Sequence, residues 1–328
     1  MRLAMSSNDT DTAASVAEDD IIFDLISMII VYRSGRVERF EPTEFVPPSF
    51  DSATGVDSKD VVINSSTSLS VRLYLPASAV AKTDYKLPVL VFFHGGGFCL
   101  HRASSLHYHN YLNHLTAKAK FISISVDYRL APEHPLPVAY YDSWEAFRWV
   151  ISGRDDWLLR YGDLGKVFIA GDSAGANIVH DLGLRLGRLG KKVEGLVMMN
   201  PYFWGNEKIG VELKERSESM FKVSDVEKVW PFICPGTTGN DDPRLNPMAE
   251  GAPSLLGLGC HRVLVGVGDK DLLLDRGRLY SEKLKESGWA GEVEFVKVEG
   301  DHGFFLAYPG NETAEAFMDR VVSFCNKD

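Results

Sequence analysis

Six short apolar runs constrain the fold of this chain more than any other feature of its sequence. The runs have almost no polar interruption, which is typical of strands buried on both faces of a sheet, and they span residues 87–93, 121–126, 167–170, 193–199, 263–267 and 293–298. Stretches with helical periodicity lie between and after them, at 108–119, 140–151, 174–189, 274–287 and 313–324. Strands that alternate with helices predict an α/β fold, with a mostly parallel, doubly wound sheet and helices on both faces.

The chain before residue 87 follows a different pattern. Residues 21–31 are apolar enough for a helix or a strand, and residues 31–40 predict two short strands around a Ser34-Gly35 turn. Residues 60–75 alternate between polar and apolar around a polar turn, which predicts a hairpin. Later in the chain, residues from about 204 to 240 break the alternation, and we expect them to form an insertion over the sheet.

Composition fits an ordinary globular protein and excludes several kinds of partner. The 328 residues are 45% hydrophobic and 24% charged, which suits one α/β domain over residues 21–328. The formal net charge of −10 argues against nucleic acid or an anionic membrane surface as the main partner. No apolar run approaches the length that spans a membrane.

The first twenty residues and the cysteines bear on compartment. Residues 1–20 carry one basic residue, Arg2, and no continuous apolar segment, so they predict a disordered tail rather than a secretory or transit peptide. The four cysteines are widely scattered and predict free thiols rather than a disulfide framework. We therefore expect a cytoplasmic protein, with the nucleus as a second compartment.

One of the strand-to-helix junctions carries a reactive pattern. Residues 167–170 run into Gly171-Asp172-Ser173-Ala174-Gly175, and helical character begins directly afterwards. A G-x-S-x-G turn between a strand and a helix is the context of a nucleophile elbow, which exposes one serine hydroxyl. A phosphate-binding loop would require Gly-Lys-Ser/Thr, which does not follow. Ser173 is therefore the predicted nucleophile.

A serine nucleophile needs a base and an acid that orients the base. Among nine histidines, His302 follows the last apolar run in a short glycine-flanked loop, which places it at the carboxyl end of a strand. Asp269 and Asp271 both follow the preceding run, and Asp271 is favoured because three leucines come next and bury it. Ser173, Asp271 and His302 then follow in the chain order of a Ser-Asp-His triad.

Attack by a serine on a carbonyl carbon also needs donors for the oxyanion that develops. His94-Gly95-Gly96-Gly97-Phe98 follows the run at 87–93, and successive glycines allow backbone amides to converge without side chains in the way. We expect Gly95, Gly96 and Gly97 to form this loop. The amide of Ala174, directly after the nucleophile, is the other predicted donor.

Together with the sequence Asp127 to Pro137, these motifs resemble the hormone-sensitive-lipase-like branch of the α/β-hydrolases, and more closely the plant carboxylesterases. The resemblance covers nearly everything after residue 20. It implies a cap formed by the N-terminal segment and residues of about 204–240, ester hydrolysis through an acyl-serine intermediate, and no metal or organic cofactor. It also implies that Gly96 and Gly97 are the usual oxyanion donors, with Gly95 shaping the loop.

Relatives of this family keep alternatives open. The plant gibberellin receptors lose the catalytic histidine, whereas His302 is present here. Hydroxyisoflavanone dehydratases and some alkaloid cyclases use a similar site for eliminations or cycloadditions, and some of the dehydratases carry Thr where this chain has Ser173. The resemblance implies a carboxylesterase acting on a small or medium ester, with a dehydratase, lyase or cyclase of plant metabolism as the alternative and a receptor third. We expect a monomer or weak dimer.

Overall fold

The computed structural model describes residues 20–26, 28–40, 44–80, 86–214 and 219–327. The chain divides into two compact units, Met1–Thr43 and Glu44–Asp328. The disordered tail predicted over residues 1–20 lies outside the described residues, except for Asp20.

In the first unit the described residues form an antiparallel sheet of three strands, β1 (Ile21–Leu25), β2 (Ile29–Tyr32) and β3 (Val37–Arg39), in that order. Phe23 and Leu25 are buried whereas Ile22 and Asp24 are exposed, so β1 buries one face from Ile22 onward. The predicted Ser34-Gly35 turn between two short strands is confirmed. Gly35 has a φ of +87°, which glycine adopts without strain.

The second unit contains a sheet whose described strands are ordered β12-β11-β10-β9-β7-β8-β6-β5-β4. The strands β12, β11, β10, β9, β7 and β8 run parallel to one another. At the other edge of the sheet, β6, β5 and β4 pair antiparallel. The strands are β4 (Phe50–Asp51), β5 (Val56–Asn64), β6 (Leu69–Pro76), β7 (Leu87–Phe93), β8 (Ile122–Asp127), β9 (Gly162–Asp172), β10 (Val193–Met199), β11 (Cys260–Gly268) and β12 (Glu292–Val298). The predicted hairpin and all six predicted strands are confirmed.

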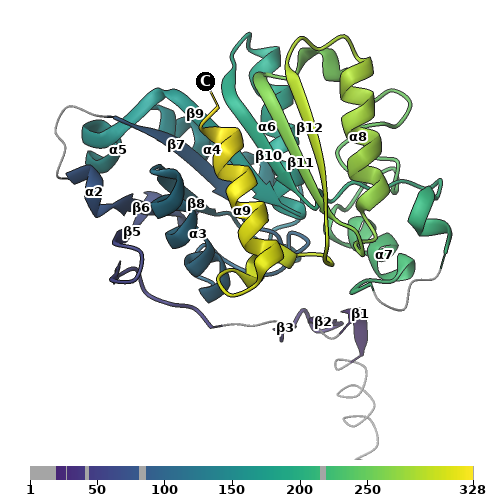
Figure 1. Ribbon diagram of the computed structural model, residues 1–328. Helices are drawn as coiled ribbons and strands as arrows, with labels where there is room; N and C mark the ends of the chain where they lie inside the picture. Colours follow the sequence, from purple (N-terminus) through teal and green to yellow (C-terminus); the bar gives the residue numbers. More distant parts are fainter. Residues whose placement is uncertain (1–19, 27, 41–43, 81–85, 215–218, 328) are drawn as a thin grey trace, which may run out of the picture. The chain divides into compact units, whose positions relative to one another are not determined.

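Helices cover both faces of this sheet, as Figure 1 shows. The helices are α2 (Ala77–Val80), α3 (Leu106–Ala119), α4 (Val138–Ile151), α5 (Asp156–Tyr161), α6 (Ala174–Arg188), α7 (Val223–Ile233), α8 (Leu274–Glu286) and α9 (Glu312–Cys325). The described residues also form short 3₁₀ helices, η1 (Gly210–Leu213), η2 (Leu255–Gly257) and η3 (Phe304–Ala307). The five predicted helices correspond to α3, α4, α6, α8 and α9.

Alternate strand residues build the core on each face. Phe92, Phe168, Val197 and Leu264 point to the face covered by α3 and α9, where they join one buried cluster with residues of those helices. Residues one position away point to the other face: a Cβ on Gly183 of α6 would meet Leu196, and one on Gly277 of α8 would meet Val267. This period of two is what buries an uninterrupted apolar strand on both sides.

The order of the strands places the carboxyl ends that matter side by side. β8 lies on one side of β7 and β9 on the other, so the direction in which the sheet is built reverses at β7. Ligands of open α/β sheets bind at such a switch point, outside the carboxyl ends of the strands. The loops after β7 and β9 are the predicted oxyanion loop and the predicted nucleophile elbow.

Candidate active site

The elbow after β9 is packed too tightly for side chains at its two glycines. An added Cβ on Gly171 would lie 2.6 Å from the carbonyl oxygen of Gly175. An added Cβ on Gly175 would overlap the carbonyl oxygen of Phe93, at the end of β7. The spacing of the G-x-S-x-G sequence therefore follows from close approach between the elbow and the central strand of the sheet.

Ser173 itself has a strained backbone, with φ +50° and ψ −117°. Its amide donates to the Met199 carbonyl at 2.9 Å, and its carbonyl accepts from the amides of Tyr202 and Asn177. A non-glycine residue held at positive φ by surrounding hydrogen bonds is typical of a functional site. Its side chain stands at the N-terminus of α6, and among the described residues Oγ makes no hydrogen bond.

The predicted acid and base are in direct contact. His302 Nδ1 donates to Asp271 Oδ2 at 2.9 Å, and Asp271 is fully buried. Because an ionised carboxylate only accepts, the proton of the neutral ring lies on Nδ1. Nε2 is then left with its lone pair, as a general base requires.

Two further donors hold the Asp271 carboxylate. The amide of Leu273 donates to Oδ1 at 2.9 Å, and the side-chain amide of Asn200 donates to Oδ2. Asp269, the competing carboxylate, instead accepts from the Gly300 amide at 3.0 Å and so organises the loop that precedes His302. Asn200 was not predicted from the sequence, although it stands directly after β10.

Negative charges around His302 outweigh the effect of its burial. Burial alone lowers the pKa of His302, but the carboxylates of Asp271, Asp172 and Asp301 raise it above the ordinary value of 6.5. The influence of Asp172, the residue before Ser173, shows that the imidazole lies within electrostatic range of the elbow. Other buried or half-buried histidines behave oppositely: burial lowers the pKa to about 4 for His94, His107 and His109, and to about 3 for His101 and His180.

The three glycines after β7 are not equivalent. The Gly95 amide donates to the Tyr108 hydroxyl at 2.9 Å, so it points into the protein. Gly96 and Gly97 have φ values of +95° and +60°, and among the described residues their amides have no hydrogen-bond acceptor. The Ala174 amide stands at the first position of α6, where a helix supplies no acceptor of its own. Gly96, Gly97 and Ala174 are thus the amides available to an oxyanion.

Part of the insertion predicted at about 204–240 lies against this site. The ring of Phe221 meets the His302 ring edge to face, with centroids 5.3 Å apart, and the Met220 amide donates to Asp301 Oδ2 at 2.6 Å. A Cβ added to Gly97 would lie 3.9 Å from Val229 of α7. These contacts place an apolar wall beside His302 and beside the predicted oxyanion loop.

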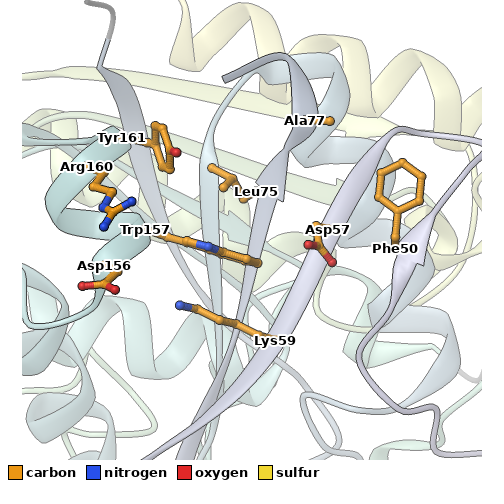
Figure 2. A pocket seen from close by; sticks show the side chains of 9 residues that line it. All are labelled: Phe50, Asp57, Lys59, Leu75, Ala77, Asp156, Trp157, Arg160 and Tyr161. Carbon is orange, nitrogen blue, oxygen red and sulfur yellow. The ribbon is translucent and has the colours of Figure 1, made fainter. Parts of the chain in front are cut away.

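A separate hollow of about 540 Å³ lies between α5 and the antiparallel edge of the sheet (Figure 2). The Lys59 ammonium stands 4.4 Å above the Trp157 ring and pairs with Asp155 at 2.8 Å. The residues that line the hollow are Phe50, Asp57, Lys59, Leu75, Ala77, Asp156, Trp157, Arg160 and Tyr161. None of the predicted site residues belongs to this lining, so the hollow is distinct from the candidate site.

Residues 90–306 match the family described as having the α/β-hydrolase fold, and the chain belongs to that family. It is 41% identical to the Arabidopsis thaliana protein named "Probable carboxylesterase 2", over 94% of this chain and 97% of that protein. It is 42% identical to a 2-hydroxyisoflavanone dehydratase of Glycyrrhiza echinata, over 95% and 98% of the two chains. Among solved structures, a thermophilic carboxylesterase cloned from a metagenomic library superposes with a TM-score of 0.72, at 25% identity, over 85% of this chain and 90% of that one.

One prediction from the sequence is wrong. The chain is 43% identical to a tuliposide A-converting enzyme of Tulipa gesneriana that is named as chloroplastic, over 94% of this chain and 78% of that one, and other tulip relatives are named as amyloplastic. These relatives point away from the cytoplasmic location expected above. The prediction failed because the charge pattern of residues 1–20 does not decide the compartment. No helix in the described part of the chain is long and apolar enough to cross a membrane.

Proposed function

We propose that this protein hydrolyses carboxylic esters through an acyl-serine intermediate. Ser173 is the nucleophile, His302 the general base, and Asp271 the acid that orients it. Gly96, Gly97 and Ala174 donate to the oxyanion, and Gly95 shapes their loop. The observation that carries the proposal is the hydrogen bond from His302 to the buried Asp271, at the same sheet edge as the strained elbow. Similarity to a carboxylesterase over nearly the whole chain supports it.

The reaction follows from these positions. Ser173 Oγ attacks the ester carbonyl carbon while His302 Nε2 takes its proton, and the carbonyl oxygen becomes an oxyanion that accepts from the three amides. Such a donor contributes on the order of 3–4 kcal/mol to the transition state. The imidazolium then protonates the departing alcohol. Water, deprotonated by His302, then attacks the acyl carbon, and the bond to Ser173 Oγ breaks as the imidazolium returns the proton to Oγ and the acid leaves.

We assign cap residues to the stretch at about 204–240, since Phe221 and Val229 stand beside His302 and Gly97. The contribution of the N-terminal segment to the cap stays a prediction, as does the monomeric or weakly dimeric state. A small-molecule ester is the proposed substrate.

A second candidate is elimination of water from a plant metabolite. The similarity to a 2-hydroxyisoflavanone dehydratase favours it, and an oxyanion hole with a histidine base can stabilise an enolate as well. The two functions differ in whether Ser173 becomes acylated. A fast elimination on one metabolite that survives Ser173→Ala, with feeble ester turnover, would favour the dehydratase.

The test of the proposed function is turnover together with labelling of the serine. Purified protein should hydrolyse p-nitrophenyl butyrate and take up one organophosphate on the peptide containing Ser173, as seen by mass spectrometry. Ser173→Ala should do neither. A folded wild type that is neither active nor labelled would exclude the proposed function.

Activity should also depend on the charge state of His302. The pKa of His302 lies above 6.5, and at pH values below this pKa the ring is protonated and cannot act as a base. We therefore expect kcat/KM to fall as the pH drops through the pKa of His302. Asp301→Asn removes one of the charges that raise this pKa and should move the acid limb to lower pH. The matched control is Asp319→Asn, which removes a charge from the ion pair with Lys118 on the outside of the fold. An acid limb that moves equally in both variants would contradict this account.

A further inference from the structure

The oxyanion loop and the nucleophile elbow are joined by a buried phenol. Tyr108, in the first turn of α3, is 1% exposed. Its hydroxyl lies 2.9 Å from the Gly95 amide nitrogen and 2.8 Å from Asp172 Oδ2. Gly95 directly precedes two proposed oxyanion donors, and Asp172 directly precedes Ser173.

The two hydrogen bonds of the Tyr108 hydroxyl have opposite directions, with Gly95 as donor and the Asp172 carboxylate as acceptor. An amide N–H can only donate, so the Tyr108 oxygen accepts from Gly95. The single phenolic hydrogen is then left to donate to Asp172. The result is one chain of hydrogen bonds from Gly95 through Tyr108 to Asp172, in which each group is buried.

Neighbouring contacts make this connection rigid. A Cβ added to Gly95 would overlap Asp172 Oδ2, so the loop and the elbow carboxyl are in close approach. The Tyr108 ring packs against those of His107 and Phe92, with centroid distances of 4.6 Å and 6.0 Å. On the other side of the loop, the hydroxyl of Tyr128 donates to the His94 carbonyl at 2.7 Å.

We infer that Tyr108 is a positioning residue for the proposed ester hydrolysis: its hydroxyl holds the oxyanion loop at a fixed distance from the nucleophile elbow. This inference rests on the proposed function. The phenol does not touch the substrate, since it is buried behind the loop. It acts through the Gly95 peptide, which sets the direction of the Gly96 and Gly97 amides relative to Ser173.

Tyr108→Phe removes the hydroxyl and keeps the ring. A displacement of about 1 Å at a reacting centre costs on the order of 100-fold in rate, and we expect kcat for p-nitrophenyl butyrate to fall about 10- to 100-fold. KM should change less than about threefold, because an oxyanion donor acts mainly in the transition state. Inhibition by a trifluoromethyl ketone, which adds to the serine and forms an oxyanion, should weaken by a factor similar to the loss in kcat.

Tyr111→Phe is the matched control. Tyr111 lies one turn later on α3 and is also fully buried, and among the described residues its hydroxyl donates to the Met199 sulfur alone, at 3.7 Å. It should keep kcat within about twofold of wild type. Equal kcat in the two variants, or a Tyr108→Phe effect confined to KM, would overturn the inference.

Two further measurements keep the result decisive if Tyr108→Phe is unstable or if the wild type is no esterase. Asp172→Ala breaks the chain of hydrogen bonds at its other end, and Asp172→Asn keeps an acceptor for Tyr108, so Asn should recover most of the kcat that Ala loses. Amide hydrogen exchange of the peptide covering residues 93–99 should quicken in Tyr108→Phe and not in Tyr111→Phe, whatever reaction the wild type catalyses. Unchanged exchange in Tyr108→Phe would exclude the positioning role, whereas absent ester turnover by wild type excludes only the proposed function.

Discussion

Asp271→Asn should lower kcat for p-nitrophenyl butyrate by about 10⁴-fold while leaving the protein folded. An amide at this position can present its N–H₂ group to His302, which favours the tautomer whose proton lies on Nε2 and removes the base from the serine. Asp271 also accepts from Asn200 and Leu273, so a carboxamide loses only part of that network. Steady-state kinetics with active-site titration would measure the loss.

Asp269→Asn provides the comparison two residues away. The Asp269 carboxylate accepts from the Gly300 amide, and an Asn oxygen can do the same. We expect its kcat to stay within about threefold of wild type. If Asp269→Asn lost the larger share of activity, the assignment of the acid would have to pass from Asp271 to Asp269.

Gly175→Ala should destabilise the fold by about 3 kcal/mol or more and abolish activity. The added methyl would overlap backbone atoms of Phe93 and His94, at the end of the central strand, and neither can move without displacing the elbow or the oxyanion loop. Overpacking that cannot relax by rotation of a side chain is among the costliest substitutions. Urea unfolding followed by tryptophan fluorescence would give the change in free energy.

Gly183→Ala on the same helix separates this packing effect from helix propensity. The atoms nearest to its methyl would be terminal methyl groups of Leu196 and Leu258, at 2.8 Å and 2.9 Å, and such side-chain ends shift more readily than backbone. Alanine is favoured over glycine within a helix by about 1 kcal/mol, so the net change should stay within about 1 kcal/mol. Equal stability of the two variants would show that the elbow does not require a glycine at position 175.

The sheet and its main helices could be predicted from the sequence because a strand buried on both faces is an uninterrupted run of apolar residues. An uninterrupted apolar run such as 87–93 can be recognised without knowing its partners, and its observed bounds are the predicted ones. The motif residues were found for the same reason, since a strained elbow and a loop of converging amides demand glycine at fixed positions. Short elements such as α5, with six residues, leave too little periodicity to detect.

The residues that support the site could not be read in this way. Asn200, Tyr108 and Asp172 lie on separate elements, and their roles depend on which strands become neighbours. Tyr108 is separated from Asp172 by 64 positions and has the periodicity of an ordinary core residue of α3. Of these three residues, only Asn200 has a recognisable signal in the sequence. It is a polar residue directly after a strand, and the neighbouring strand precedes the predicted acid.

The contact between Phe221 and His302 has a consequence for how this chain could acquire new substrates. The proposed nucleophile, acid, base and oxyanion loop all follow strands of the sheet, whereas Phe221 and Val229 belong to one continuous stretch of sequence between β10 and β11. Exchanging that stretch changes the wall of the site and leaves the reacting groups in place. In the proposed enzyme, substrate selectivity therefore depends on the stretch between β10 and β11, whereas the chemistry depends on residues that follow the strands. Recombination between relatives can change the selectivity and keep the reacting groups.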